Sequence, residues 1–152
     1  MKIVRPFNKV PAKEAFSRSI YIAILSVMTE SDVDALDAGL GSLKARGFTG
    51  IVFVPSSEGD MRFRYYERLA YWELDQLELA ARVIFWLPTK TANVRDALRT
   101  QFGIYAASGK AVLCGPEKAS GFDYLRLVAN RYHVPSVFTL DAAFTEVLRR
   151  LD

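Results

Sequence analysis

Five short apolar runs alternate along the chain with segments of helical periodicity, and this alternation limits the folds that the chain can adopt. The apolar runs lie at residues 19–27, 50–57, 82–88, 110–116 and 135–140. The helical patterns lie at residues 29–47, 64–81, 93–108, 121–133 and 141–151. Nearly continuous apolar strands between helices are typical of a parallel sheet that is covered on both faces. The pattern therefore predicts an α/β fold, a flavodoxin-like or Rossmann-like three-layer sandwich with a five-stranded parallel sheet.

The pattern also divides the chain into two parts. Residues 1–18 contain Pro6, Pro11 and five basic residues, and we expect them to form an N-terminal arm. Residues 19–152 are expected to form a single domain, because a chain of this length supports one hydrophobic core. In open parallel sheets ligands bind beyond the carboxyl ends of the strands, so a site is expected just after Leu25, Val54, Leu87 and Gly115.

Composition excludes several classes of protein. Hydrophobic residues make up 51% of the chain and charged residues 24%, which is typical of a globular protein and not of a disordered one. No apolar run reaches the ~18 residues that a membrane-spanning helix needs. The N-terminal segment lacks the apolar stretch of a secretory signal. The single cysteine, Cys114, has no partner for an internal disulfide, which favours a reducing compartment and a cytoplasmic location.

The charge of the chain sets weak limits on its partner. A net charge of +3 is a mild excess that ordinary surface lysines and arginines explain, and that would also favour an anionic ligand. Nucleic-acid binding requires a denser basic stripe or a base-stacking motif. The segment RFRYYERLAYW, residues 62–72, combines arginines with aromatic residues, but helical spacing explains its aromatics as core at least as well. We therefore expect neither a nucleic acid nor a membrane as the partner.

Two polar residues interrupt apolar helical stripes. The inward stripe of the helix at 64–81 contains Glu73, and that of the helix at 93–108 contains Gln101. Their stripe neighbours are Tyr66, Leu69, Leu77 and Ala80 for the first, and Val94, Leu98, Tyr105 and Ser108 for the second. A buried carboxylate is costly unless it is paired, hydrogen-bonded or functional, so Glu73 is either a structural group or a site residue. Because the two helices flank the third apolar run, both side chains are able to converge on one pocket.

Other chemistries find little support in the sequence. His133 is the only histidine, which excludes a His-rich metal site, and its place near a helix end suggests a charge–dipole role. Neither a GxGxxG motif nor a phosphate-binding GxxxxGK[ST] loop is present. No cofactor and no metal are therefore expected.

The segments YWELDQLELAARVIFWLP and TQFGIYAASGKAVLCGPE carry a resemblance to a known family. Together they resemble nucleoside 2-deoxyribosyltransferase-like proteins, which share a Trp-Glu helix, an aromatic strand that ends in proline, and a Gly-Lys turn into an apolar strand. The resemblance covers roughly residues 19–151. It implies a flavodoxin-like fold, cleavage of the N-glycosidic bond of a nucleoside or nucleotide, and often a site completed across a homo-oligomer interface.

The resemblance also implies roles for individual residues. In the family a glutamate attacks the anomeric carbon and a second carboxylate assists. Glu73 matches the second carboxylate, and Gln101 falls on the position of the nucleophile. The ligand-binding residues expected around them are Tyr71, Trp72, Trp86, Asp96, Ser56 and Glu58.

The departures from the family pattern are large. Glutamine has no ionisable carboxyl, so Gln101 is neither a nucleophile nor a general base. The small residues that commonly end the first strand are replaced by Ile24 and Leu25, and the usual Asn-Pro after the second strand is Val54-Pro55. Either the chain is a naturally impaired relative that binds without turnover, or Gln101 replaces a native glutamate by engineering. The second explanation leaves Ile24, Leu25 and Val54 unexplained, so we favour the first.

Two alternatives remain open at this stage. In one, the protein is an active glycosidic-bond enzyme that uses Glu73, Asp96, Glu58 or Asp60 as its carboxylate. In the other, the fold is a non-catalytic interaction module that forms a homo-oligomer through its aromatic helix. A monomer at micromolar concentration would count against the second alternative.

Overall fold

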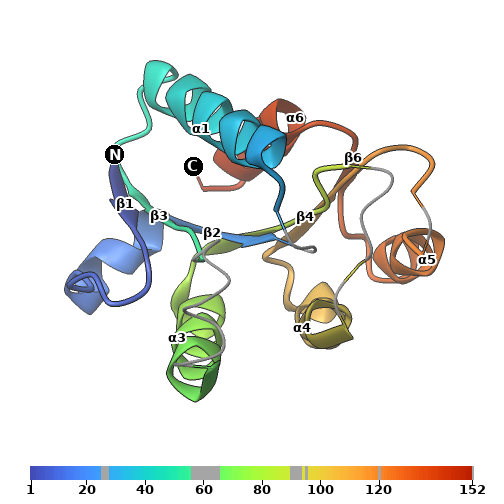
Figure 1. Cartoon of the computed structure of the whole chain (residues 1–152), viewed down its shortest axis with the longest axis horizontal. Helices are drawn as coiled ribbons and strands as arrows, with labels where there is room; N and C mark the ends of the chain where they lie inside the picture. Colours follow the sequence, from blue (N-terminus) through green and yellow to red (C-terminus); the bar gives the residue numbers. More distant parts are fainter. Residues whose placement is uncertain (25–27, 56–65, 90–93, 95, 120, 152) are drawn as a thin grey trace.

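The computed structural model describes the chain apart from residues 25–27, 56–65, 90–93, 95, 120 and 152. Its centre is a sheet of six parallel strands in the order β1-β3-β2-β4-β5-β6 (Figure 1). The strands are β1 (Lys2–Val4), β2 (Ser19–Ile24), β3 (Ile51–Phe53), β4 (Arg82–Trp86), β5 (Ala111–Cys114) and β6 (Ser136–Val137). Strands β2 to β6 have the order of a flavodoxin-like sheet, so the predicted α/β class is confirmed.

Helices cover both faces of this sheet. On one face lie α1 (Glu30–Ala45) and α6 (Leu140–Arg149), and on the other lie α3 (Tyr66–Leu79), α4 (Asp96–Tyr105) and α5 (Asp123–Arg131) (Figure 1). Two short 3₁₀ helices complete the described elements: η1 (Lys13–Arg18) before β2, and η2 (Ala106–Ser108) after α4. The result is the three-layer arrangement that the alternation of apolar runs predicts.

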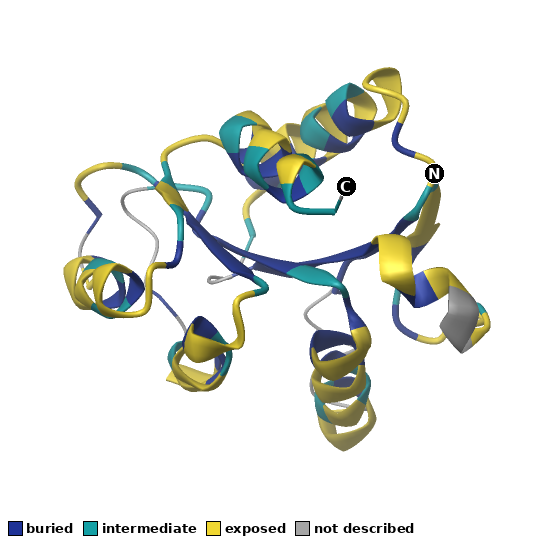
Figure 2. Cartoon of the chain, turned by 180° about the vertical axis from the view of Figure 1, so that it is seen from behind, coloured by how far each residue is buried: buried dark blue, intermediate teal, exposed yellow. Residues whose placement is uncertain are grey.

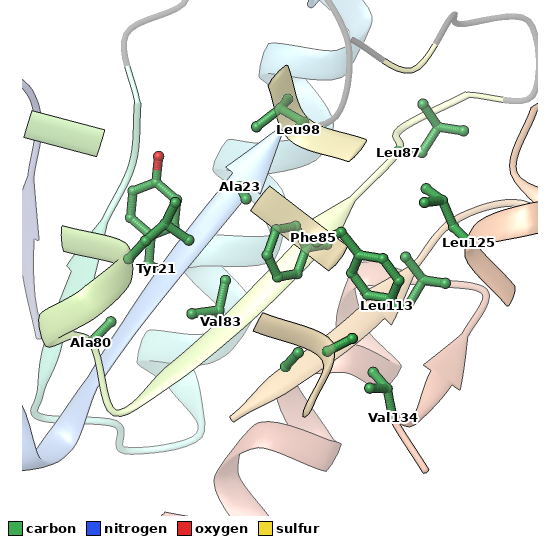
Figure 3. Close-up of a cluster of buried hydrophobic side chains, with 14 of the residues drawn as sticks. Tyr21, Ala23, Ala80, Val83, Phe85, Leu87, Leu98, Leu113, Leu125 and Val134 are labelled. Carbon is green, nitrogen blue, oxygen red and sulfur yellow. The ribbon is translucent and has the colours of Figure 1, made fainter. Parts of the chain in front are cut away.

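The two central strands, β2 and β4, contribute side chains to both layers of the core, because successive side chains of a strand point to opposite faces. In β2, Tyr21 and Ala23 belong to the apolar cluster under α3, α4 and α5, whereas Ile20 and Ile22 belong to the cluster under α1 and α6. Figure 2 shows the consequence: the central strands are buried, and the helices are exposed on their outer sides. Figure 3 shows part of the α3–α4–α5 cluster, with Phe85 near its centre. The ring of Phe102 packs edge to face against Phe85, with 5.2 Å between the ring centres.

The strand count differs from the prediction, because the sheet has six strands and not five. The additional strand, β1, comes from the segment assigned to the N-terminal arm, and it pairs with β3 through the register Lys2↔Ile51 to Val4↔Phe53. It is three residues long and buries only Val4, so it has too little apolar periodicity to be recognised in the sequence.

The last strand is also shorter than predicted. β6 ends at Val137, and the predicted run at 135–140 is cut short because α6 begins at Leu140. Thr139 caps this helix by accepting a hydrogen bond from the Ala142 amide at 3.2 Å. The helix predicted over residues 141–151 therefore begins one residue earlier, at Leu140.

Helix α1 begins and ends at residues whose chemistry suits a helix terminus. Thr29 is the N-cap, and it forms a capping box with Asp32, whose carboxylate accepts a hydrogen bond from the Thr29 amide at 2.8 Å. At the other end Gly47 has φ +78°, and the Phe48 amide donates to the Leu43 carbonyl. This left-handed turn suits glycine, which has no Cβ to clash.

The same turn closes α5, but with a residue other than glycine. The Val134 amide donates to the Ala129 carbonyl at 2.8 Å, and His133 occupies the left-handed position with φ 56°. Left-handed backbone is disfavoured for residues with a side chain, although histidine tolerates it better than most. The structure thus gives His133 a strained backbone position in addition to the charge–dipole role predicted for it.

We predict that His133→Gly stabilises the protein by about 0.5–1 kcal/mol, because glycine removes the left-handed strain at a modest entropic cost. The free energy of unfolding is measured by chemical denaturation. The matched variant Gly47→Ala places a side chain into the equivalent turn of α1 and should be destabilising by about 1 kcal/mol. Loss of stability in His133→Gly would show that the imidazole matters more than the backbone strain.

Candidate functional site

A groove of about 260 Å³ separates α3 from α4, on the face of the sheet that these helices cover. Both helices run back from the carboxyl end of the sheet, so the groove begins where parallel-sheet proteins bind ligands. Its lining comes from the two facing helix surfaces: Tyr66, Leu69, Ala70, Glu73, Leu74, Ala97, Thr100, Gln101 and Ile104. The lining is mostly apolar with a few polar groups, which is the usual character of a small-molecule pocket.

Glu73 and Gln101 line this groove from opposite walls. Both are buried, with 8% of Glu73 and 7% of Gln101 exposed, as their positions on the apolar stripes predict. Leu69 and Leu77 of α3, and Leu98 of α4, are buried with them, so the stripes are correct over most of their length. The structure therefore brings together the two polar residues that the spacing singled out.

The Gln101 amide is incompletely satisfied. Its Oε1 atom is buried and has no hydrogen-bond partner among the residues that the structure describes. A buried carbonyl acceptor without a donor costs roughly 1–3 kcal/mol relative to a satisfied one. Gln101 lines the groove, and its Oε1 atom lies beneath the groove surface, so a bound molecule donates to it once the side-chain amide turns toward the groove.

The described lining offers limited acid–base chemistry. Glu73 supplies its one carboxylate, and the Thr100 hydroxyl already donates to the Asp96 carbonyl at 3.2 Å. Hydrolysis or transfer at a glycosidic bond uses two carboxyl groups, of which one acts as nucleophile or base and the other as acid. The described lining of the groove supplies one of these two carboxyl groups.

Lys110 holds the distal ends of the two groove helices. Its Nζ donates to the carbonyls of Leu77, Glu78 and Ala80 at the end of α3, and it lies 4.8 Å from the centre of the Tyr105 ring at the end of α4. Burial lowers the pKa of Lys110, and the nearby Glu78 opposes that shift. A cation at a helix C-terminus satisfies carbonyls that have no partner within the helix.

The predicted aromatic ligand-binding residues do not share this groove. Trp72 packs on the sheet beside Tyr21 and Phe53, with ring centres 6.2 Å and 6.4 Å away, and with Tyr71 it lines another depression on α3. Trp86 belongs to the apolar cluster under α1 and α6, which is the opposite face of the sheet. Helix α3 therefore separates Tyr71 and Trp72 from Gln101, and the sheet separates Trp86 from it.

The remaining candidates lie elsewhere or are not described. Asp96 begins α4 with a fully exposed carboxylate, 3.9 Å from the Arg99 guanidinium, and it does not line the groove. Ser56, Glu58 and Asp60 lie outside the described residues. Of the predicted site residues, the structure therefore places Glu73 and Gln101 together and leaves Asp96 apart.

Gln76 is a buried polar residue that the sequence analysis does not single out. Only 4% of it is exposed, and its Oε1 atom has no partner within the described part of the chain. It lies one turn after Glu73 on the same buried surface of α3. The sequence does carry a signal for this burial: Gln76 lies three residues after Glu73 and next to Leu77, and therefore on the same side of the helix.

The lone cysteine does not contribute chemistry to the site. Cys114 is fully buried in β5, and this burial raises the pKa of its thiol to about 12. At neutral pH it is a thiol and not a nucleophilic thiolate. Among the described residues no group of three His, Cys, Asp or Glu side chains is placed to hold a metal ion, and no helix has the length and apolarity to cross a membrane.

Comparison with models of known protein families finds no match for this chain, and comparison with curated proteins finds none either. The resemblance to nucleoside 2-deoxyribosyltransferase-like proteins therefore rests on the sequence motifs alone.

We predict that Lys110→Met lowers the free energy of unfolding by about 2 kcal/mol, because the carbonyls at the end of α3 lose a charged donor. Hydrogen exchange of the last turn of α3 should accelerate in the same variant. Lys44→Met, in the exposed last turn of α1, is the matched control and should change stability by less than ~0.5 kcal/mol. Equal effects of the two substitutions would show that Lys110 does not hold α3.

Proposed function

We propose that the protein binds a nucleoside, or a nucleotide-derived small molecule, in the α3–α4 groove without cleaving its glycosidic bond. The observation that carries the proposal is the buried, unsatisfied Gln101 carbonyl in a groove that it shares with Glu73. The resemblance of the surrounding motifs to nucleoside 2-deoxyribosyltransferase-like proteins supports the choice of ligand class.

The proposed recognition follows from hydrogen-bond chemistry. An amide offers one acceptor and two donors, and a carboxylate offers acceptors only. A sugar hydroxyl both donates and accepts, so it is able to satisfy Gln101 while a second hydroxyl donates to Glu73. The apolar walls of the groove, such as Leu69 and Ala97, provide contact for the less polar faces of the ligand.

The absence of turnover follows from the same two residues. In the mechanism implied by the resemblance, a carboxylate at the Gln101 position forms a covalent glycosyl intermediate. A neutral amide has no ionisable group there and forms no such ester. Glu73, the remaining carboxylate of the described groove, would then act as an acceptor for the ligand and not as one member of a catalytic pair.

One observation favours an active enzyme as the second candidate. Glu73 is a buried carboxylate that lines the groove, which supports it as the alternative nucleophile. Asp96 is a weaker alternative because its carboxylate points to solvent outside the groove. An active enzyme of this kind would release base as it stands and would lose that activity in Glu73→Ala.

A chromatographic base-release assay tests the proposal. The protein and Gln101→Glu are incubated with nucleosides, deoxynucleosides, nucleotides and dinucleotides, and binding is followed by calorimetry. We expect saturable binding by both proteins and base release by Gln101→Glu alone. Gln76→Glu is the matched control, because it adds the same carboxylate to a buried position of α3 that does not line the groove.

Two results would contradict the proposal. Base release by the unmodified protein, abolished by Glu73→Ala, would favour the active enzyme. If the folded protein binds no member of the panel, nucleosides and nucleotides are not its ligands. Circular dichroism of each variant shows whether a loss of binding reflects a loss of fold.

A further inference from the structure

The outer flank of α3 forms a second depression, separate from the α3–α4 groove. It has a volume of about 300 Å³ and is lined by Phe7, Asn8, Arg68, Tyr71, Trp72 and Asp75. The four α3 residues are spaced i, i+3, i+4 and i+7, so they form one stripe along the helix. The segment that follows β1 lies beside this flank of α3 in both views (Figures 1 and 2).

Phe7 is held across this stripe in an unfavourable backbone conformation. Its φ is +68°, which is rare for a bulky residue and costs roughly 1–2 kcal/mol. The turn is maintained by its neighbours: the Asn8 side chain accepts from the Arg5 amide at 3.0 Å, and the Asn8 amide donates to the Arg5 carbonyl at 3.1 Å. Strain of this kind collects at binding sites, where it fixes a side chain in place.

The result is an aromatic slot with a charge at each end. The Arg68 guanidinium lies 4.9 Å from the centre of the Phe7 ring, and the Tyr71 side chain is 61% exposed. Asp75 lies seven residues after Arg68, or about 10 Å along the helix axis. Exposed rings stack on planar ligands, a guanidinium binds phosphate or carboxylate, and a carboxylate accepts from ring N–H groups.

We propose that this depression binds a planar aromatic ring that carries an anionic group, the chemistry of a nucleoside monophosphate. The ring stacks on Tyr71, the anionic group pairs with Arg68, and Asp75 accepts hydrogen bonds from the far edge of the ring. Trp72 forms the floor beneath them. This site lies on the opposite flank of α3 from Gln101, so it does not depend on the function proposed for the α3–α4 groove.

Fluorescence offers a direct test, because Trp72 is one of only two tryptophans in the chain. In a Trp86→Phe background Trp72 is the sole indole reporter. The probe is guanosine 5′-monophosphate, whose ring edge presents adjacent N–H donors to a carboxylate. We expect saturable quenching with a Kd of about 0.1–1 mM, as suits a shallow site, and weaker binding of both guanosine and inorganic phosphate.

Substitutions at the site locate the binding. Tyr71→Ala and Arg68→Met should each weaken binding about tenfold, through loss of the stacking surface and of the cation. Asp75→Asn should weaken the binding of the nucleotide but not that of phosphate. The matched control Tyr124→Ala, which removes an exposed tyrosine of α5, should bind as the parent does.

The proposal fails if the probe produces no saturable quenching while the protein remains folded. It also fails if Tyr71→Ala and Arg68→Met bind the nucleotide as tightly as the parent. Loss of binding in Gln101→Ala together with retention in Tyr71→Ala would assign the nucleotide to the α3–α4 groove instead.

Discussion

The parallel pairing of β2 with β4 is the constraint on which the rest of the structure depends. These strands join over five residues, from Ile20↔Arg82 to Ile24↔Trp86, and they are apolar on both faces. A sheet of this kind has to be covered twice, and parallel strands require crossover helices to connect them. The chain leaves β2 for α1 on one face and passes from β4 to α4 on the other face. The point between β2 and β4, where the connections change from one face of the sheet to the other, is the expected ligand position in such folds.

The α3–α4 groove is a consequence of the same packing. α3 and α4 both rest on the cluster that contains Phe85, and Lys110 ties their distal ends. Buried polar side chains on the facing helix surfaces are costly in a core that is otherwise close-packed and apolar. Glu73 and Gln101 are buried there nonetheless, and this supports the proposal that the groove recognises a polar ligand.

Apolar periodicity predicted the architecture because it reports burial directly. It placed Glu73, Leu77, Leu98 and Gln101 on inward faces, and the structure buries all four. It failed where burial is slight: β1 buries one residue, and β6 is only two residues long. Tyr66 was also assigned to an inward stripe, but it is exposed at the first residue of α3, where the helix begins at the mouth of the groove.

The candidate site was predictable only in part, for a different reason. Helical spacing places a residue on a face of its own helix but does not tell which neighbour that face meets. Trp86 and Tyr71 were therefore grouped with Gln101, although one lies across the sheet and the other on the far flank of α3. The sequence does not single out Gln76, because a single polar residue beside a leucine is common on amphipathic helices.

The central claim is that the Gln101 side-chain amide contacts the ligand, and its NMR signal tests this most directly. In a ¹⁵N-labelled protein the Gln101 side-chain NH₂ pair is assigned by its loss in Gln101→Ala, and 2′-deoxyadenosine is then titrated. We predict that the Gln101 pair shifts saturably while the Gln76 pair stays in place. A Gln101 pair that does not move at saturating nucleoside or nucleotide would contradict the claim.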